Sequence, residues 1–193
     1  PFARALPLEK ARHPDTILAF DLNDQPLPTD HGAPLRLIVP GWYGMAGVKW
    51  ISRIEALTEP FGGYYQKRRY IYDYDDGREP GPVTSMLVKA IITATHDGDV
   101  VPVGPLTIVG RAWSGVGSIA KVEVTVDGGD NWQEATLHPA PSPYGWQAFE
   151  YRWQAAGPGR HALRARATDS QGKWQGLDVD LCRRGVERRL DVV

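Results

Sequence analysis

The sequence has a single cysteine, Cys182, among its 193 residues. One cysteine cannot close an internal disulfide, and it cannot supply the cysteine pairs of a structural zinc site. The five histidines do not have the spacing that is typical of metal ligands. Long apolar runs are also missing, because no uncharged stretch approaches the roughly 18 residues that a membrane span needs. We therefore expect no disulfide framework, no cluster of metal-ligating side chains and no membrane span.

A surplus of charge of one sign is absent as well. The 22 Lys and Arg residues balance 23 Asp and Glu residues, and the formal net charge is −1. Nucleic-acid binding depends on a basic field that attracts phosphates, so no nucleic acid is expected as a partner. The hydrophobic fraction of 42% is ordinary for a globular protein, and a chain of this length buries enough surface for a core. The composition thus predicts a folded chain of one large or two small domains.

Helical periodicity is scarce in the first half of the sequence, where prolines are frequent. Residues 33–39 alternate between apolar and other side chains and predict a strand that ends at a Pro-Gly turn. Residues 48–56 alternate in the same way and predict a second strand. Arg36 and Lys49 then lie on the less apolar faces of these two strands. The acidic, proline-containing run from about residue 73 to 82 predicts a linker.

The second half consists of short alternating segments separated by turn signals. In one of them valines alternate with polar residues before Asp127-Gly128-Gly129, a sequence typical of a hairpin. The pattern predicts about seven strands, at 85–93, 106–113, 119–126, 132–137, 149–153, 161–169 and 177–181. Together they predict an immunoglobulin-like β-sandwich without the disulfide, with Trp113 and Trp132 inside it.

Two blocks of sequence resemble a known family. The string NDQPLPTDHGAPLRLIVPGWYGMAGVKWISRI, followed by PFGGYYQKRRYIY, resembles the molybdopterin domain of the sulfite oxidase family. The strings GRAWSGVGSIAKVEVTVDGGDNW and RARATDSQGKWQ are similar to that family's C-terminal dimerisation domain. The resemblance implies a mainly β chain, with a partial α+β molybdopterin-domain segment over 1–78 and an immunoglobulin-like dimerisation domain over 79–193. The match corresponds to the C-terminal part of such an enzyme.

The family's chemistry is oxygen-atom transfer at a molybdenum held by a pterin dithiolene and one cysteine thiolate. The resemblance implies that His31, Arg36 and Lys49 contact the pterin and its phosphate, and a planar guanidinium and a point ammonium both suit a phosphate. It also implies that Tyr70 is the active-site tyrosine. A phenol at that place donates a hydrogen bond without adding negative charge that would repel sulfite.

Near the C-terminus the resemblance implies that Arg184, directly before Gly185, is the substrate-binding arginine that the dimerisation domain supplies. Arg68 and Arg69 precede Tyr70 and would extend a basic funnel for anions. Cys182 does not match the family's cysteine ligand, which lies in an upstream part of the molybdopterin domain, and we expect it to be a small buried side chain. The chain alone is therefore expected not to hold the cofactor in a working state. Trp42 is the tryptophan expected to be exposed near the pocket.

The function implied by the resemblance is oxidation of sulfite to sulfate, with molybdenum-molybdopterin as cofactor and electrons passed to a separate acceptor such as a cytochrome. A homodimer through the sandwich domain is implied as well. Two alternatives stay open: a related molybdoenzyme acting on another oxyanion or an organic substrate, and a non-catalytic dimerisation module. A carbohydrate-binding sandwich would need a row of exposed tryptophans on one face. The sequence leaves the compartment open between periplasm and cytoplasm.

Overall fold

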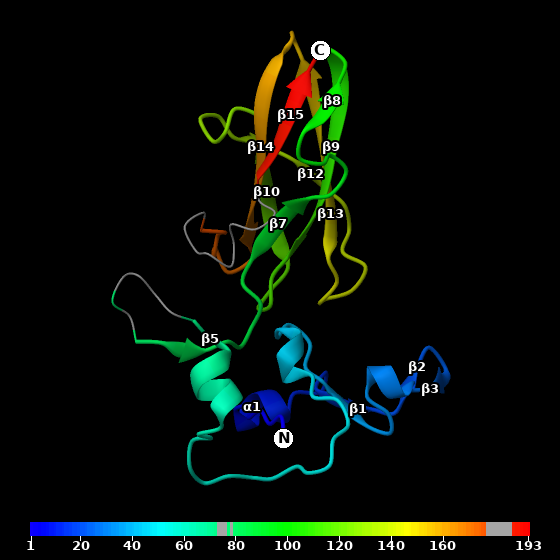
Figure 1. Cartoon of the computed structure of the whole chain (residues 1–193), viewed down its shortest axis with the longest axis vertical. Helices are drawn as coiled ribbons and strands as arrows, with labels where there is room; N and C mark the ends of the chain where they lie inside the picture. The colour runs from blue at the N-terminus through cyan, green and yellow to red at the C-terminus, as the bar shows by residue number, and fades with distance from the viewer. Residues whose placement is uncertain (73–76, 78, 177–186) are drawn as a thin grey trace. The chain divides into compact units, whose positions relative to one another are not determined.

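The computed structural model describes residues 1–72, 77, 79–176 and 187–193, and the chain divides into two compact units, Pro1–Met86 and Leu87–Val193 (Figure 1). The division falls later than the boundary between residues 78 and 79 that the sequence indicates. Backbone hydrogen bonds hold residues 81–86 to the first unit. Strand β6 (Gly81–Pro82) pairs with β5 (Ile71–Tyr72), and the Met86 N–H donates to the Gly41 carbonyl over 2.8 Å. The end of the expected linker is therefore part of the first unit.

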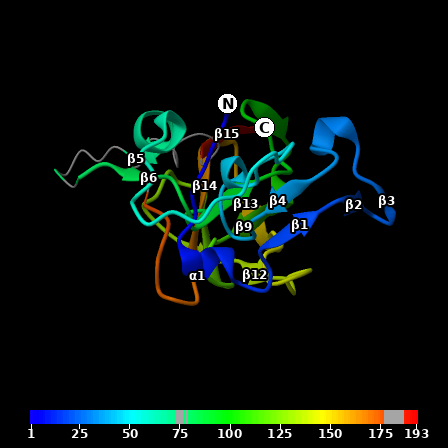
Figure 2. The same cartoon turned by 90° about the horizontal axis from the view of Figure 1, so that it is seen from below.

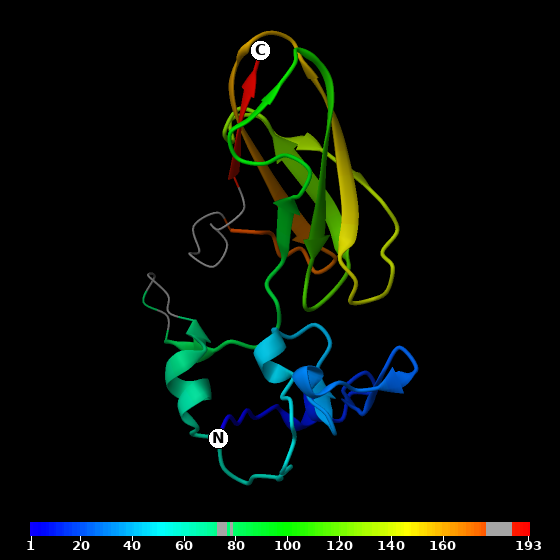
Figure 3. The same ribbon diagram turned by 45° about the vertical axis from the view of Figure 1, so that its right-hand side comes forward.

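The second unit is built from two sheets (Figure 3). The five-stranded sheet has the order β11 (Gln133–Glu134), β10 (Ile119–Thr125), β14 (Gly159–Asp169), β15 (Glu187–Val192) and β8 (Asp99–Val101). The four-stranded sheet has the order β12 (Thr136–Leu137), β13 (Gln147–Ala155), β9 (Gly104–Trp113) and β7 (Lys89–Ile92). Neighbouring strands are antiparallel except for β15 and β8, which are parallel. The mainly β fold and the sandwich expected from the sequence are confirmed.

The sandwich core follows the alternation of the sequence, because successive side chains of a strand point to opposite faces. Val122 and Val124 of β10 and Leu163 of β14 are fully buried, and they form one cluster with Phe149 of β13. Gly110 of β9 lies between its two neighbours in the four-stranded sheet, β7 and β13: a Cβ there would lie 2.2 Å from both the Ile91 carbonyl oxygen and the Phe149 ring. Glycine is required at this position because no side chain fits.

Two expectations about the sandwich are wrong. Trp113 and Trp132 are half-buried and do not belong to the core. Trp113 stacks on Trp146 with ring centroids 4.5 Å apart, and Trp132 lies under the Arg166 guanidinium at 4.2 Å. Indole rings pack well against other planar groups outside a core, and period-two alternation does not distinguish that position from an interior one.

The strand pattern of the second unit also differs from the expectation in detail. The strand expected at 132–137 is split into β11 and β12, which belong to different sheets. Strands β8 and β15 were not predicted, because β8 is short and β15 carries charged residues. The strand expected at 177–181 lies outside the described residues.

The first unit consists of short elements with a small core. Its elements are α1 (Leu8–Ala11), β1 (Ile17–Ala19) paired with β4 (Arg36–Ile38), the hairpin of β2 (Asp21–Leu22) and β3 (Gln25–Pro26), two 3₁₀ turns η1 (Thr29–His31) and η2 (Gly44–Ala46), and the π-helix η3 (Tyr65–Arg69). In Figures 1 and 2 the β1–β4 pair and the hairpin lie on one side of this unit, and η3 and β5 lie on the other. Leu27, Val39, Ala46 and Val83 are among its buried apolar residues.

The second strand expected in this unit, at 48–56, is not formed. The segment lies beside β4, with the Leu37 N–H donating to the Val48 carbonyl and the Ile51 N–H to the Leu35 carbonyl, at 2.9 and 3.0 Å. Between these two contacts Trp50 adopts a φ of 52°, which no strand residue has. The backbone therefore turns at the position where the alternation predicted a continuous strand.

Among the residues that the structure describes, no helix is long and apolar enough to cross a membrane.

Candidate functional site

A tight turn after η1 forms the centre of the candidate cofactor site. The turn ends at Gly32, whose φ of 110° is in the left-handed region that favours glycine. A Cβ at Gly32 would lie 2.8 Å from the Cβ of Lys49 and 3.1 Å from the Cβ of Arg36. The missing side chain therefore lets β4 and the 48–51 segment close around the turn.

Arg36 and Lys49 are both tied to the backbone of this turn. The Nη1 of Arg36 donates to the His31 carbonyl, and the Nζ of Lys49 donates to the Asp30 carbonyl, each over 2.9 Å. His31 itself is exposed at the end of η1. The structure thus brings together His31, Arg36 and Lys49, the three residues that the sequence predicts to bind the cofactor.

The two cations keep their positive charge available to a ligand. Among the described residues neither Arg36 nor Lys49 forms an ion pair with a carboxylate, since the acceptors of their side-chain hydrogen bonds are neutral carbonyl oxygens. Within the same part of the chain the buried Nε of Arg36 has no hydrogen-bond partner. An unsatisfied guanidinium donor next to an ammonium is a donor set that fits a phosphate, which accepts several charge-assisted hydrogen bonds.

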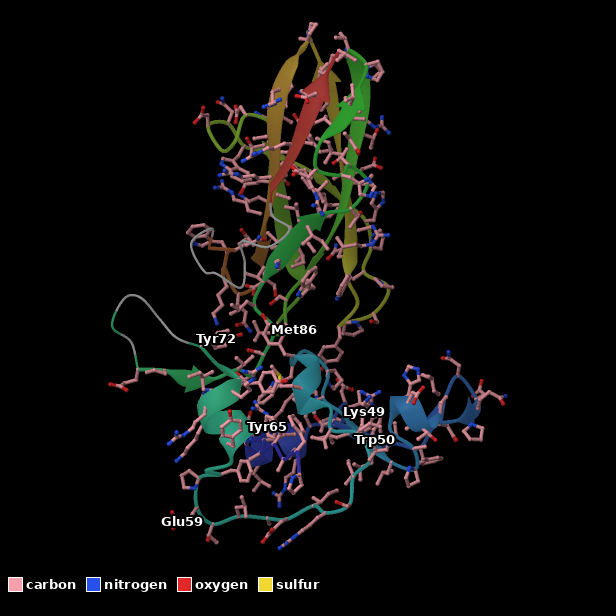
Figure 4. The ribbon with its side chains drawn as sticks, viewed as in Figure 1. Lys49, Trp50, Glu59, Tyr65, Tyr72 and Met86 are labelled. Carbon is pink, nitrogen blue, oxygen red and sulfur yellow. The ribbon has the colours of Figure 1, made fainter. Side chains whose placement is uncertain are left out.

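Trp50, which lies in the segment 48–56 where the sequence predicts a strand, is also part of this cluster. Its Nε1 donates to the Thr29 carbonyl over 2.9 Å, and the Lys49 Nζ lies 4.7 Å from its ring centroid. Figure 4 shows Lys49 and Trp50 side by side. The indole is 54% exposed, whereas Trp42, the tryptophan expected to be exposed, is half-buried with its backbone bridged to Ser85. The adjacent Lys-Trp pair was the one sequence signal that could have identified this contact.

Tyr70 belongs to a separate aromatic cluster of the first unit. It follows η3, and its ring stacks on Tyr65 with centroids 6.4 Å apart. Phe2 meets both rings, at 4.8 Å from Tyr65 and 6.4 Å from Tyr70. In the part of the chain that the structure describes, no hydrogen bond or ring contact joins Tyr70 to the Gly32 turn. The expected cofactor residues and the expected catalytic tyrosine therefore form two clusters.

The surroundings of Tyr70 are basic. Lys67, Arg68 and Arg69 are exposed on η3, and the half-buried Arg4 lies with its Cζ 5.8 Å from the Tyr70 ring centroid. Burial lowers the pKa of Arg4, and its interaction with Tyr70 opposes this shift. Arg4 was missed in the sequence because nothing local connects residue 4 to residue 70.

Two other expected residues, Arg184 and Cys182, lie outside the described residues. Over the described ranges no group of three or more His, Cys, Asp or Glu side chains is placed to hold a metal ion.

Each of the two units matches a known family model. Residues 1–65 match the family model described as oxidoreductase molybdopterin binding domain, and residues 82–177 match the Mo-co oxidoreductase dimerisation domain. The mitochondrial sulfite oxidase of Mus musculus is 38% identical over 146 residues, which are 70% of this chain and 27% of the relative. That of Drosophila melanogaster is 34% identical over 192 residues, which are 88% of this chain and 34% of the relative.

Two further proteins that are similar to this chain have names that refer to other substrates. The nitrate reductase [NAD(P)H] of Hordeum vulgare is 34% identical over 163 residues, which are 74% of this chain and 18% of the relative. The crystal structure of the sulfane dehydrogenase SoxCD from Paracoccus pantotrophus superposes with a TM-score of 0.78 and 30% identity, covering 95% of this chain and 50% of that chain.

A molybdopterin-binding segment followed by a Mo-co dimerisation domain defines a molybdenum-cofactor oxidoreductase. More closely, the chain belongs to the sulfite oxidase family and corresponds to the end of the molybdopterin domain together with the dimerisation domain. It spans about a third or less of the sulfite oxidases of mouse and fruit fly.

Proposed function

We propose that this chain is part of a sulfite-oxidase-type enzyme that oxidises sulfite to sulfate and passes the electrons to a separate acceptor such as a cytochrome. The observation that carries the proposal is the convergence of Arg36 and Lys49, without carboxylate partners among the described residues, on one turn of the molybdopterin-binding segment.

Arg36 and Lys49 would bind the phosphate of molybdopterin, and His31 would contact the same group from the end of η1. The unsatisfied Nε of Arg36 supports this assignment, because a phosphate oxygen is the acceptor that the buried donor lacks. Trp50 would keep Lys49 in place through its contact with the ammonium. The cofactor itself supplies the two-electron oxygen-atom chemistry when it is bound.

Tyr70 would act at the reacting end of the site. Its hydroxyl would donate a hydrogen bond to the anionic substrate, and the exposed cations of η3 would raise the local concentration of that anion. Arg184 would add a second contact to the substrate from the dimerisation domain. In this assignment the chain provides phosphate binding, anion attraction and one hydrogen-bond donor, and the metal's cysteine ligand comes from outside this sequence.

The surface of the first unit supports a larger molybdopterin domain. Large apolar side chains are exposed on it, including Ile17, Leu18, Phe20 and Leu22 around the β1–β2 region, with exposures from 42% to 64%. Large apolar side chains that are exposed together on one region normally pack against another part of a protein. We propose that the remainder of the molybdopterin domain covers it, and that this remainder carries the cysteine ligand, since Cys182 does not match it.

A homodimer through the sandwich is part of the proposal, supported by the match of residues 82–177 to a dimerisation domain. Sedimentation equilibrium of the 21.4 kDa chain tests it, with a mass of twice that value as the expected result. A species that stays monomeric at micromolar concentration would contradict the dimer.

The activity is tested on the complete protein, including any residues encoded upstream of Pro1, loaded with molybdenum cofactor. We expect sulfite-dependent reduction of an artificial electron acceptor. No turnover in fully loaded protein would contradict sulfite oxidation. If the complete protein takes up no molybdenum when it is supplied with the cofactor, as measured by metal analysis, it is a non-catalytic module. The 193-residue chain alone is expected to be inactive.

The second candidate function is the same type of molybdoenzyme acting on a substrate other than sulfite. It is supported by the likeness to a sulfane dehydrogenase at a TM-score of 0.78 and by the identity to a nitrate reductase over 74% of the chain. The same assay with a sulfane-sulfur donor, and with nitrate plus a reduced dye, distinguishes these substrates from sulfite by their relative kcat/KM.

A further inference from the structure

Arg4 reaches across the first unit to two backbone carbonyls that are far away in the sequence. Its Nη1 donates to the Tyr65 carbonyl over 3.0 Å, and its Nη2 donates to the Val83 carbonyl over 2.9 Å. The first carbonyl opens the π-helix η3, and the second follows β6. One guanidinium therefore links the two segments on either side of Tyr70.

The same two residues hold the backbone of Tyr70. The Tyr70 N–H donates to the Tyr65 carbonyl over 3.0 Å, and the Val83 N–H donates to the Tyr70 carbonyl over 2.9 Å. Arg4 thus donates to the Tyr65 carbonyl, which also accepts from the Tyr70 N–H. It donates as well to the carbonyl of Val83, whose own N–H donates to Tyr70. Removing the guanidinium would loosen both attachments of the Tyr70 backbone at once.

The N-terminal segment also covers the rings of this cluster. The Ala5 N–H donates to the Gln66 Oε1 over 2.9 Å, next to the contacts of Phe2 with Tyr65 and Tyr70. Figure 4 shows the labelled Tyr65 on η3 beside the N-terminal part of the chain. Residues 2–5 are therefore joined to η3 through side chain and backbone.

The arginine also has an energetic cost at this position. Its Nε is buried without a hydrogen-bond partner among the described residues, and such a donor costs about 1–3 kcal/mol. An apolar side chain of similar volume would avoid this cost, but it would also remove the donor to the Tyr65 and Val83 carbonyls. The Cζ of Arg4 lies 5.8 Å from the Tyr70 ring centroid, within the range of a cation–π contact.

We propose that Arg4 is a positioning residue for Tyr70: it fixes the backbone on both sides of the tyrosine and places a permanent positive charge beside its ring. The effect of Arg4 on activity rests on the proposed role of Tyr70 in catalysis. Its effect on the position of Tyr70 does not depend on that role. Arg4 touches neither substrate nor cofactor in this assignment, so it acts only through Tyr70.

The first experiment uses the chain itself, labelled with 3-fluorotyrosine and observed by ¹⁹F NMR. The Tyr70 resonance is identified by its loss in Tyr70→Phe. In Arg4→Met we expect this resonance to shift by more than its linewidth or to broaden, and Arg4→Lys, which keeps the charge, should restore part of the shift. Arg12→Met removes an exposed cation of the same unit and should leave the resonance in place.

An unchanged Tyr70 resonance in a folded Arg4→Met protein would overturn the proposal. If Arg4→Met does not fold, Arg4→Lys decides the question, because it keeps a charge but replaces the planar two-nitrogen fork by a single ammonium nitrogen. A Tyr70 resonance identical to that of the unmodified chain in Arg4→Lys would then contradict the bridging role.

The second experiment is a double-mutant cycle in the complete, cofactor-loaded enzyme. We expect Arg4→Met to lower kcat/KM about tenfold when Tyr70 is present and to have little further effect in the Tyr70→Phe background. Equal effects in both backgrounds would show that Arg4 does not act through Tyr70. If the enzyme does not oxidise sulfite at all, the proposed function fails while the NMR result still tests the inference.

Discussion

The glycine at the centre of the candidate cofactor site offers a quantitative test of how that site is built. Gly32→Ala meets two penalties: a φ of 110° that L side chains rarely adopt, and a new Cβ only 2.8 Å from the Cβ of Lys49. The backbone term is about 1–2 kcal/mol, and overpacking adds about 1–3 kcal/mol. We expect the first unit to lose about 2–5 kcal/mol of its free energy of unfolding, measured by urea denaturation.

Two other glycines separate these penalties. Gly98→Ala also has a positive φ, of 84°, but its Cβ meets nothing within 4 Å, so we expect only the backbone term of about 1–2 kcal/mol in the second unit. Gly44→Ala has neither problem and should be neutral or slightly stabilising. A loss in Gly32→Ala no greater than in Gly98→Ala would refute the argument that the missing Cβ is what lets Lys49 and Arg36 close on the turn.

Three further predictions concern charge and packing. Lys49→Met should leave the melting temperature of the chain within a few degrees but lower the molybdenum content of the complete protein severalfold, with Lys10→Met as the control; equal metal content would remove Lys49 from the site. Gly110→Ala should destabilise the sandwich by more than about 3 kcal/mol in thermal unfolding, because its Cβ would lie 2.2 Å from a carbonyl oxygen and a buried ring. Hydrogen bonding from Arg166 lowers the pKa of Glu123, so the contribution of Glu123 to stability is present above its unfolded pKa and is lost as the pH falls through the lower folded pKa. Glu123→Gln should therefore flatten the pH dependence of the free energy of unfolding below about pH 5, and an unchanged profile would contradict this.

The sandwich could be predicted from the sequence because its signal is local. Alternation over 119–126 and 161–169 marks strands whose inward residues, such as Val122 and Leu163, form the core. Residues 48–56 show the same alternation, and the prediction fails there. Hydrogen bonds from the Trp50 N–H and Nε1 to the Gly32 and Thr29 carbonyls turn the backbone at Trp50, and those partners lie about twenty residues away in the sequence.

The candidate site was predictable only as far as motif resemblance reached. His31, Arg36 and Lys49 were named from short strings, and the structure brings them to one turn. Arg4 had no such signal, because its contacts span 61 and 79 residues of sequence. A contact between residues so far apart in the sequence can be recognised only in the three-dimensional structure, where η3 and β6 have been placed.

The two clusters of the first unit differ in how far they depend on distant parts of the chain. Arg36 and Lys49 are oriented by carbonyls of the adjacent turn, at Asp30 and His31, and neutral acceptors orient a cation without cancelling its charge. The acceptors that orient them all lie within residues 29–51, so this orientation can exist in a chain that spans about a third or less of its mouse and fly relatives. Tyr70 instead depends on a guanidinium from the N-terminal segment. Perturbing the first residues of the chain should therefore disturb the catalytic end of the proposed site while leaving the phosphate-binding end intact.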